Sequence, residues 1–89
     1  MLFVIAYKTS LPTNRTGQER FKATDGAAPP PGVRKIASYH YLDGSGGYTI
    51  AESDDPVALA KWANQWSDVI MMDVRPVLTD EQMGQVLGS

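Results

Sequence analysis

A glycine-rich turn near the middle of the chain restricts the fold more than any other feature. Residues 43–47 read DGSGG and are flanked by segments 33–42 and 48–53, which are rich in β-branched and aromatic residues. This pattern predicts a β-hairpin, because aspartate and glycine accept the positive φ angles that tight turns require. The remaining elements are placed around this hairpin.

Two further strands and three helices are predicted outside the hairpin. Apolar, β-rich runs predict strands over residues 2–7 and 69–77. Breaker residues, acidic caps and a capping box predict helices over 13–24, over 56–66 and from 79 onward. The order is β-α-β-β-α-β plus a short C-terminal helix. It predicts an α+β, ferredoxin-like fold, with two helices on one face of a four-stranded antiparallel sheet.

The apolar pattern of the strands predicts a homodimer. All four strands carry apolar residues on both faces, whereas a sheet with one wet face alternates more cleanly. The 89 residues, 1–89, form one small domain, and without cysteine no disulfide can supplement its core. We therefore expect the uncovered sheet face to pack against a second copy, as in a dimeric α+β barrel.

Charge and composition argue against several classes of partner. The formal charge is −2 and the eight basic residues are scattered, so nucleic acid is not expected as a partner. The apolar start MLFVIAY is too short for a membrane span and lacks the features of a signal peptide, so a cytoplasmic protein without a membrane partner is expected. A single histidine and scattered carboxylates lack the spacing of a metal site, and no motif indicates a cofactor.

Several motifs together resemble a known family. APPPGV, SYHYLDGSGGY, AESDDP, WANQW and VRPVL resemble a bacterial family catalogued as domain of unknown function 3303. The resemblance covers nearly the whole chain and implies a ferredoxin-like fold of the dimeric α+β barrel type, with no assigned function. Proteins of the same superfold include cofactor-free monooxygenases, muconolactone isomerase and polyketide cyclases, which is an analogy of fold alone. The positions that match the family pattern are His40, Gly44, Gly46, Gly47, Glu52, Trp62 and Trp66.

The predicted hairpin register gives His40 two polar neighbours. If residues 43–47 form the loop, Leu42 lies opposite Tyr48. Side chains alternate between the faces of a sheet, so His40, Tyr48 and Glu52 then share one face, with Glu52 diagonally beside His40. A register shift of one residue would place His40 and Glu52 on opposite faces.

Two interpretations of His40 follow. A carboxylate beside an imidazole is a suitable acid/base pair, so His40 and Glu52 could transfer protons while Tyr48 orients a substrate. Such a site suits a cofactor-independent cyclase, isomerase or monooxygenase. In the commoner case, a histidine beside a glutamate in a dimer core only satisfies hydrogen bonds and fixes the register.

The aromatic residues are the candidates for ligand contacts. Trp62 and Trp66 lie four residues apart and could line a cleft between helix and sheet, although such a stripe is usually core. Tyr39 and Tyr41 are predicted on the face opposite His40, under the helices. Three hypotheses stay open: a homodimer that binds a small apolar or aromatic ligand, the cofactor-independent enzyme, and an interaction module that binds another protein through its C-terminal helix.

Overall fold

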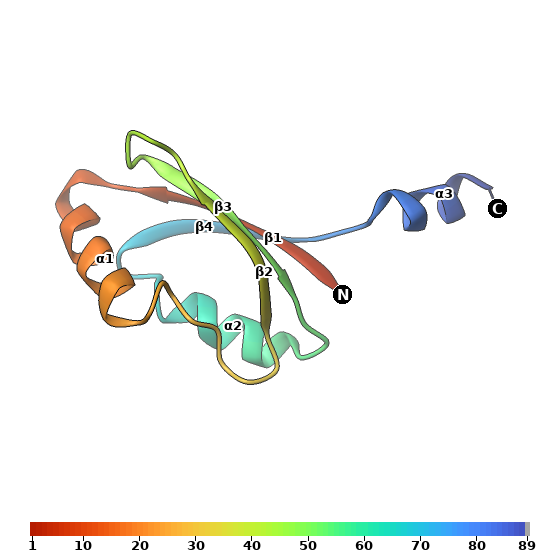
Figure 1. The fold of residues 1–89 in the computed structure, drawn as a ribbon, viewed down its shortest axis with the longest axis horizontal. Coiled ribbons are helices and arrows are strands. Elements are labelled where there is room, and N and C mark those ends of the chain that lie inside the picture. Colours follow the sequence, from red (N-terminus) through yellow and green to blue (C-terminus); the bar gives the residue numbers. More distant parts are fainter. Residues whose placement is uncertain (89) are drawn as a thin grey trace.

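The computed structural model describes residues 1–88 as a four-stranded sheet with two helices on one face and a third helix at the C-terminal end (Figure 1). The strands pair only with antiparallel neighbours, in the order β2-β3-β1-β4. The elements are β1 (Leu2–Thr9), α1 (Leu11–Ala23), β2 (Arg34–His40), β3 (Gly46–Glu52), α2 (Pro56–Asn64), β4 (Ile70–Val77) and α3 (Asp80–Gly88). The predicted α+β, ferredoxin-like arrangement is confirmed.

Local signals fix where the helices begin. The carboxylate of Asp55 accepts hydrogen bonds from the backbone N–H groups of Val57 and Ala58, both at 3.1 Å, and caps α2. In α3, the predicted capping box forms between Thr79 and Gln82, with distances of 2.9 and 3.1 Å. Helix α1 begins earlier than predicted, because proline is tolerated in a first helical turn, where its missing N–H needs no partner.

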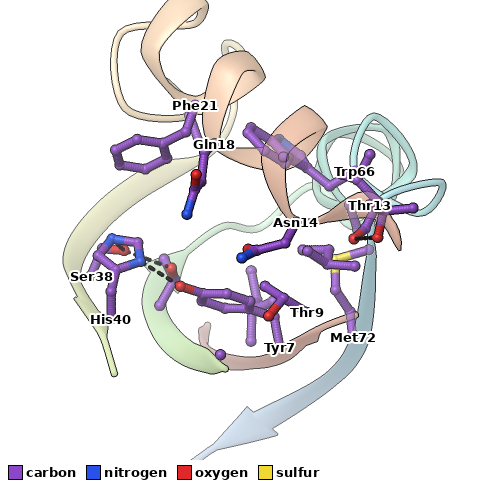
Figure 2. A pocket seen from close by; sticks show the side chains of 18 of the residues that line it. Tyr7, Thr9, Thr13, Asn14, Gln18, Phe21, Ser38, His40, Trp66 and Met72 are labelled. Carbon is purple, nitrogen blue, oxygen red and sulfur yellow. Dashed lines mark hydrogen bonds between the residues drawn. The ribbon is translucent and has the colours of Figure 1, made fainter. Parts of the chain in front are cut away.

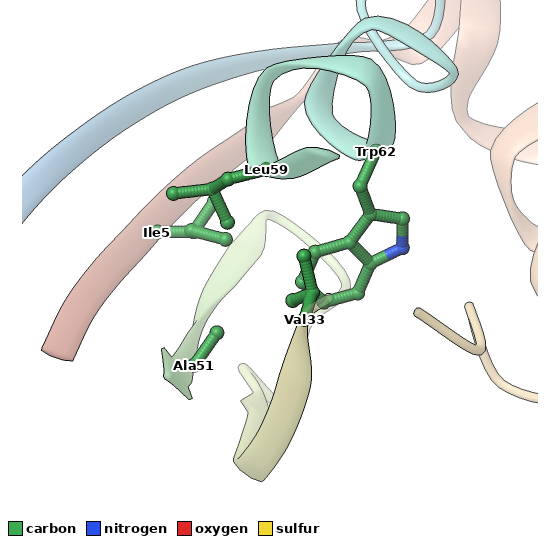
Figure 3. Packing of buried hydrophobic residues seen from close by; sticks show 5 residues of the cluster. All are labelled: Ile5, Val33, Ala51, Leu59 and Trp62. Carbon is green, nitrogen blue, oxygen red and sulfur yellow. The ribbon is translucent and has the colours of Figure 1, made fainter. Parts of the chain in front are cut away.

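The apolar core lies between α2 and the sheet. Leu59 and Trp62 of α2 pack on Ile5 of β1 and Ala51 of β3, and Val33 closes the cluster (Figure 3). All five side chains are buried. Their burial holds α2 directly against the sheet, because removing apolar surface from water is the main favourable term in folding.

Helix α1 is attached differently, since none of its residues is buried. The Thr13 hydroxyl donates to the backbone carbonyl of Val69 at 2.9 Å. The Arg20 guanidinium forms two hydrogen bonds with the Asp68 carboxylate, at 2.6 and 2.9 Å, and these bonds lower the pKa of Asp68. Polar contacts with the segment before β4 therefore hold α1, which leaves space between this helix and the sheet.

The hairpin register differs from the prediction. The turn occupies residues 41–45, and His40 lies opposite Gly47 rather than Ile50. The predicted loop counted Gly46 and Gly47 as turn residues, whereas both belong to β3. A Cβ on Gly46 would lie 2.3 Å from the Tyr7 carbonyl oxygen, so glycine is needed there for close strand contact rather than for the turn.

Candidate functional site

A pocket of about 490 Å³ lies between α1, α2 and the sheet (Figure 2). Its apolar wall includes Ile5, Trp62, Val69 and Met72. The side of α1 that faces the sheet carries a different set of residues: Thr13, Asn14, Gly17, Gln18 and Phe21. Because most of these side chains are small or polar, they do not fill the space above the sheet as an apolar stripe would.

One side of the pocket carries a hydrogen-bonded pair, Tyr7 and His40. The Tyr7 hydroxyl forms a hydrogen bond with Nδ1 of His40, and Phe21 packs edge-on against the imidazole with ring centroids 5.2 Å apart (Figure 2). Tyr7 and His40 both lie opposite Gly47, on the two strands that flank β3. A Cβ on Gly47 would lie 2.9 Å from the Tyr7 ring, so the missing side chain lets Tyr7 reach across β3.

Ser38 and Thr49 extend this polar group. The Ser38 hydroxyl lies 3.0 Å from that of Thr49 and 3.5 Å from Nε2 of His40. If Tyr7 donates to Nδ1, the neutral imidazole carries its proton on Nε2 and can donate it to Ser38 or to a ligand. Burial raises the pKa of Tyr7, and the nearby Tyr41 acts in the same direction, so the phenol stays protonated at neutral pH.

The structure separates the predicted catalytic residues. His40 lines the pocket, but Tyr48 and Glu52 lie on the opposite face of the sheet. The predicted proximity of His40 and Glu52 is therefore wrong, because the observed register changes which residues share a face. Glu52 instead pairs with Arg34 at 3.0 Å.

The predicted aromatic ligand contacts divide in the same way. Trp62 and Trp66 line the pocket, and Trp62 also belongs to the core. Tyr39 lies on the face away from the helices, where its ring is 5.4 Å from that of Tyr48, so its predicted place under the helices is wrong. Tyr41 lies in the turn and is exposed.

Sequence reasoning missed most of the polar pocket wall. Tyr7 is hidden in an apolar strand, and only its register opposite Gly47 reveals its role. The polar residues of α1 do leave a signal in the sequence, because apolar residues are few between 13 and 24 and Gly17 interrupts them. Such a thin apolar stripe is typical of a helix that stands away from a filled core.

The fold and the pocket define a small ferredoxin-like protein with a binding-sized cleft between helices and sheet. The chain belongs to the family described as domain of unknown function (DUF3303), whose model matches residues 1–89. It is similar in structure to Rv0793 from Mycobacterium tuberculosis, with a TM-score of 0.53 and 17% identity over 89% of this chain and 96% of that chain. This likeness concerns the fold alone. A search of curated proteins finds no match, and within residues 1–88 no helix has the length and apolar character needed to cross a membrane.

Proposed function

We propose that the protein binds a small aromatic or apolar molecule in the pocket between α1, α2 and the sheet. The pocket itself carries the proposal. Its volume of about 490 Å³ falls within the range of roughly 300–1,000 Å³ that is typical of small-molecule sites. Its wall combines apolar and aromatic side chains with a few polar groups, which is the usual composition of such a site.

An NMR titration with 2-naphthol tests this function. Both tryptophans of the chain line the pocket, so both indole N–H signals report on it. We expect 2-naphthol to shift both signals in a saturable manner. Gly17→Leu places a side chain inside the pocket and should abolish the shifts, whereas Gly84→Leu, on α3, should leave them unchanged. No shift in the wild-type protein, or unchanged binding in Gly17→Leu, would contradict the proposal.

A second candidate function is cofactor-independent proton transfer by His40. The Tyr7–His40 hydrogen bond at the pocket wall favours this function, because a hydrogen-bond partner such as Tyr7 can fix the tautomer and orientation of a catalytic imidazole. Tyr7 then takes the place beside the imidazole that the sequence suggested for Glu52. The reaction class would be isomerisation or cyclisation of an aromatic or polyketide-like molecule.

Proton exchange tests this second function. 2-Tetralone carries acidic protons beside its carbonyl group, and their replacement by deuterium in D₂O is followed by NMR. We expect the wild-type protein to accelerate the exchange and His40→Gln to abolish the acceleration. Ser38→Ala, which keeps the Tyr7–His40 pair, serves as the control. Exchange at the buffer rate with wild-type protein would eliminate proton transfer as a function, while leaving ligand binding untouched.

We also propose that a second copy of the chain covers the open face of the sheet. Apolar side chains occupy this face on the two central strands, among them Val4 of β1, together with Tyr48 and Ile50 of β3. Four of its charged groups neutralise each other in the pairs Arg34–Glu52 and Arg75–Asp73, both at 3.0 Å, and the exposed Lys8 lies at one end of the face. An apolar face with internally paired charges suits another copy of itself better than a charged partner.

Helix α3 extends away from the body of the molecule and offers a further contact for this second copy (Figure 1). Its apolar residues Met83 and Leu87 are 48% and 77% exposed and lie four residues apart on one side of the helix. Sedimentation equilibrium tests the arrangement. Val4→Lys and the double variant Met83→Glu/Leu87→Glu should weaken the dimer, whereas Val57→Lys on the outer side of α2 should not. A folded wild-type monomer at micromolar concentration would refute it.

A further inference from the structure

The charged side chains that line the pocket are all of one sign. Lys22 and Lys35 line it, together with the ionisable rings of Tyr7 and His40. No aspartate or glutamate lines the pocket among the described residues, although the chain has ten of them and a net charge of −2. A concave surface with charge of one sign concentrates its field and attracts ligands of the opposite sign.

Among the described residues, these two lysines also lack partners of opposite charge. Within residues 1–88 the ion pairs involve the N-terminus and three arginines, and neither Lys22 nor Lys35 forms one. Lys35 is partly buried, and its ammonium group donates to the Gly26 carbonyl at 2.6 Å. A neutral carbonyl oxygen compensates an ammonium ion only in part, so an anion in the pocket would stabilise the site.

A third donor is buried and unused. Trp62 is only 5% exposed, and its indole Nε1 is the one buried side-chain nitrogen or oxygen in residues 1–88 without a hydrogen-bond partner. Figure 3 shows this nitrogen turned away from Ile5, Leu59 and Ala51 of the core cluster. An indole N–H can only donate, and buried polar groups are nearly always paired. The Trp62 ring also lines the pocket, so an acceptor group on a ligand would satisfy Nε1 once the ligand displaces the atoms that cover it.

We infer that the ligand is a small aromatic or apolar acid, whose carboxylate or other anionic oxygen is held by Lys22, Lys35 and the N–H of Trp62. The inference rests on the proposed binding function and names the ligand class. Phe21, Trp66 and Met72 then contact the apolar body of the molecule. Each anchoring group is a donor, which matches a carboxylate because that group only accepts.

Three naphthalene derivatives of similar size test the inference by calorimetry: 2-naphthoate, the neutral 2-naphthamide and the cationic 2-naphthylmethylammonium. We expect 2-naphthoate to bind about tenfold more tightly than 2-naphthamide, a difference of about 1.4 kcal/mol, since hydrogen bonds to charged groups are stronger than those between neutral groups. The cation should bind most weakly. Added salt should reduce the advantage of 2-naphthoate, because part of it is electrostatic.

Variants that each remove one positive charge distinguish an effect inside the pocket from an effect elsewhere on the surface. Lys22→Met and Lys35→Met should each reduce the affinity for 2-naphthoate and leave that for 2-naphthamide unchanged. Lys61→Met, on an exposed part of α2 outside the pocket, is the control and should change neither. Because Lys35 also supports the Gly26 carbonyl, Lys22→Met keeps the test valid if Lys35→Met fails to fold.

The outcomes distinguish this inference from the proposed function. Tighter binding of 2-naphthoate, with a selective shift of the Trp62 indole N–H signal, supports the acid-binding site. Equal binding of 2-naphthoate and 2-naphthamide, or equal effects of Lys22→Met and Lys61→Met, overturns the acid inference but leaves ligand binding intact. Binding of none of the three compounds overturns the proposed function and the inference together.

Discussion

Replacing Gly17 by alanine should stabilise the protein. Gly17 lies in the interior of α1, and its φ angle is not among the positive values of the chain. A Cβ at this position would meet Val69 at 3.8 Å, an ordinary van der Waals contact. Alanine in a helix interior is more stable than glycine by about 0.5–1 kcal/mol. For a domain of this size, each kcal/mol raises the melting temperature by about 4–8 °C, so we expect a rise of about 2–8 °C.

Gly44→Ala is the matched control. It makes the same chemical change at a site where an added Cβ also meets no other atom closely, but the φ angle there is +76°. An L-residue in this left-handed conformation costs about 1–2 kcal/mol, so this variant should melt at a lower temperature than the wild type. The two substitutions should therefore act in opposite directions.

Thermal unfolding followed by circular dichroism measures both variants. If Gly17→Ala melts at or below the temperature of the wild type, α1 does not unfold together with the sheet, and the described attachment of α1 is wrong. If Gly44→Ala is as stable as Gly17→Ala, backbone conformation does not decide the effect of a glycine substitution in this chain.

Three further predictions concern capping, burial and pH. In urea unfolding, Asp55→Ala should lower the free energy of unfolding by about 1 kcal/mol, since it removes both cap bonds of α2. The control is Asp54→Ala, because the exposed Asp54 carboxylate forms an ion pair with the N-terminus and does not cap the helix. This variant should cost at most about 1 kcal/mol, and less than Asp55→Ala. Ser53→Ala should cost about 1–3 kcal/mol in the same assay, because the buried Ser53 hydroxyl donates to the Gly32 carbonyl at 2.7 Å and accepts from the Asp55 N–H at 3.0 Å; an unchanged midpoint would refute this. Because the pKa of Tyr7 is raised, its phenol keeps its proton in the folded state at pH values where the unfolded chain has lost it. The contribution of the protonated phenol to the free energy of unfolding is therefore complete below about pH 10 and is lost as the pH rises further. The stability difference between the wild type and Tyr7→Phe should accordingly fall above pH 10 and stay constant between pH 7 and 9, and a constant difference up to pH 11 would contradict the assignment.

The order of the elements was predictable because each boundary carries a local signal. The acidic cap of α2 and the Thr79–Gln82 capping box both form as the sequence indicates. Local chemistry decides such boundaries, and a single sequence contains it. The elements confirm the predicted fold class, although most of their ends differ from the predicted ends by one or two residues.

The candidate site was less predictable, because it depends on contacts between distant segments. Gly46 and Gly47 look like turn residues in the sequence, yet their lack of a side chain serves the close approach of β1 at Gly46 and of β2 and the Tyr7 ring at Gly47. Only the partner strand reveals this function. Counting both glycines in the loop placed Glu52 beside His40, and the correct register replaces Glu52 by Tyr7. A shift in register thus changes the chemistry proposed for the histidine.

Two glycines, Gly17 and Gly47, shape the pocket in different ways. Gly17 interrupts the apolar stripe of α1, and without a side chain it adds nothing to the volume between this helix and the sheet. Gly47 leaves the surface of β3 bare, so the Tyr7 ring can cross it and reach His40. A larger side chain at Gly17 would fill part of this space, because an added Cβ there would meet only Val69, at 3.8 Å, and a core without cavities is more stable. At Gly47 a Cβ would lie 2.2 Å from the Tyr39 carbonyl oxygen, so no larger side chain fits there. Gly17 therefore leaves the pocket open and Gly47 admits the polar pair to its wall, and the proposed ligand would occupy the space that remains.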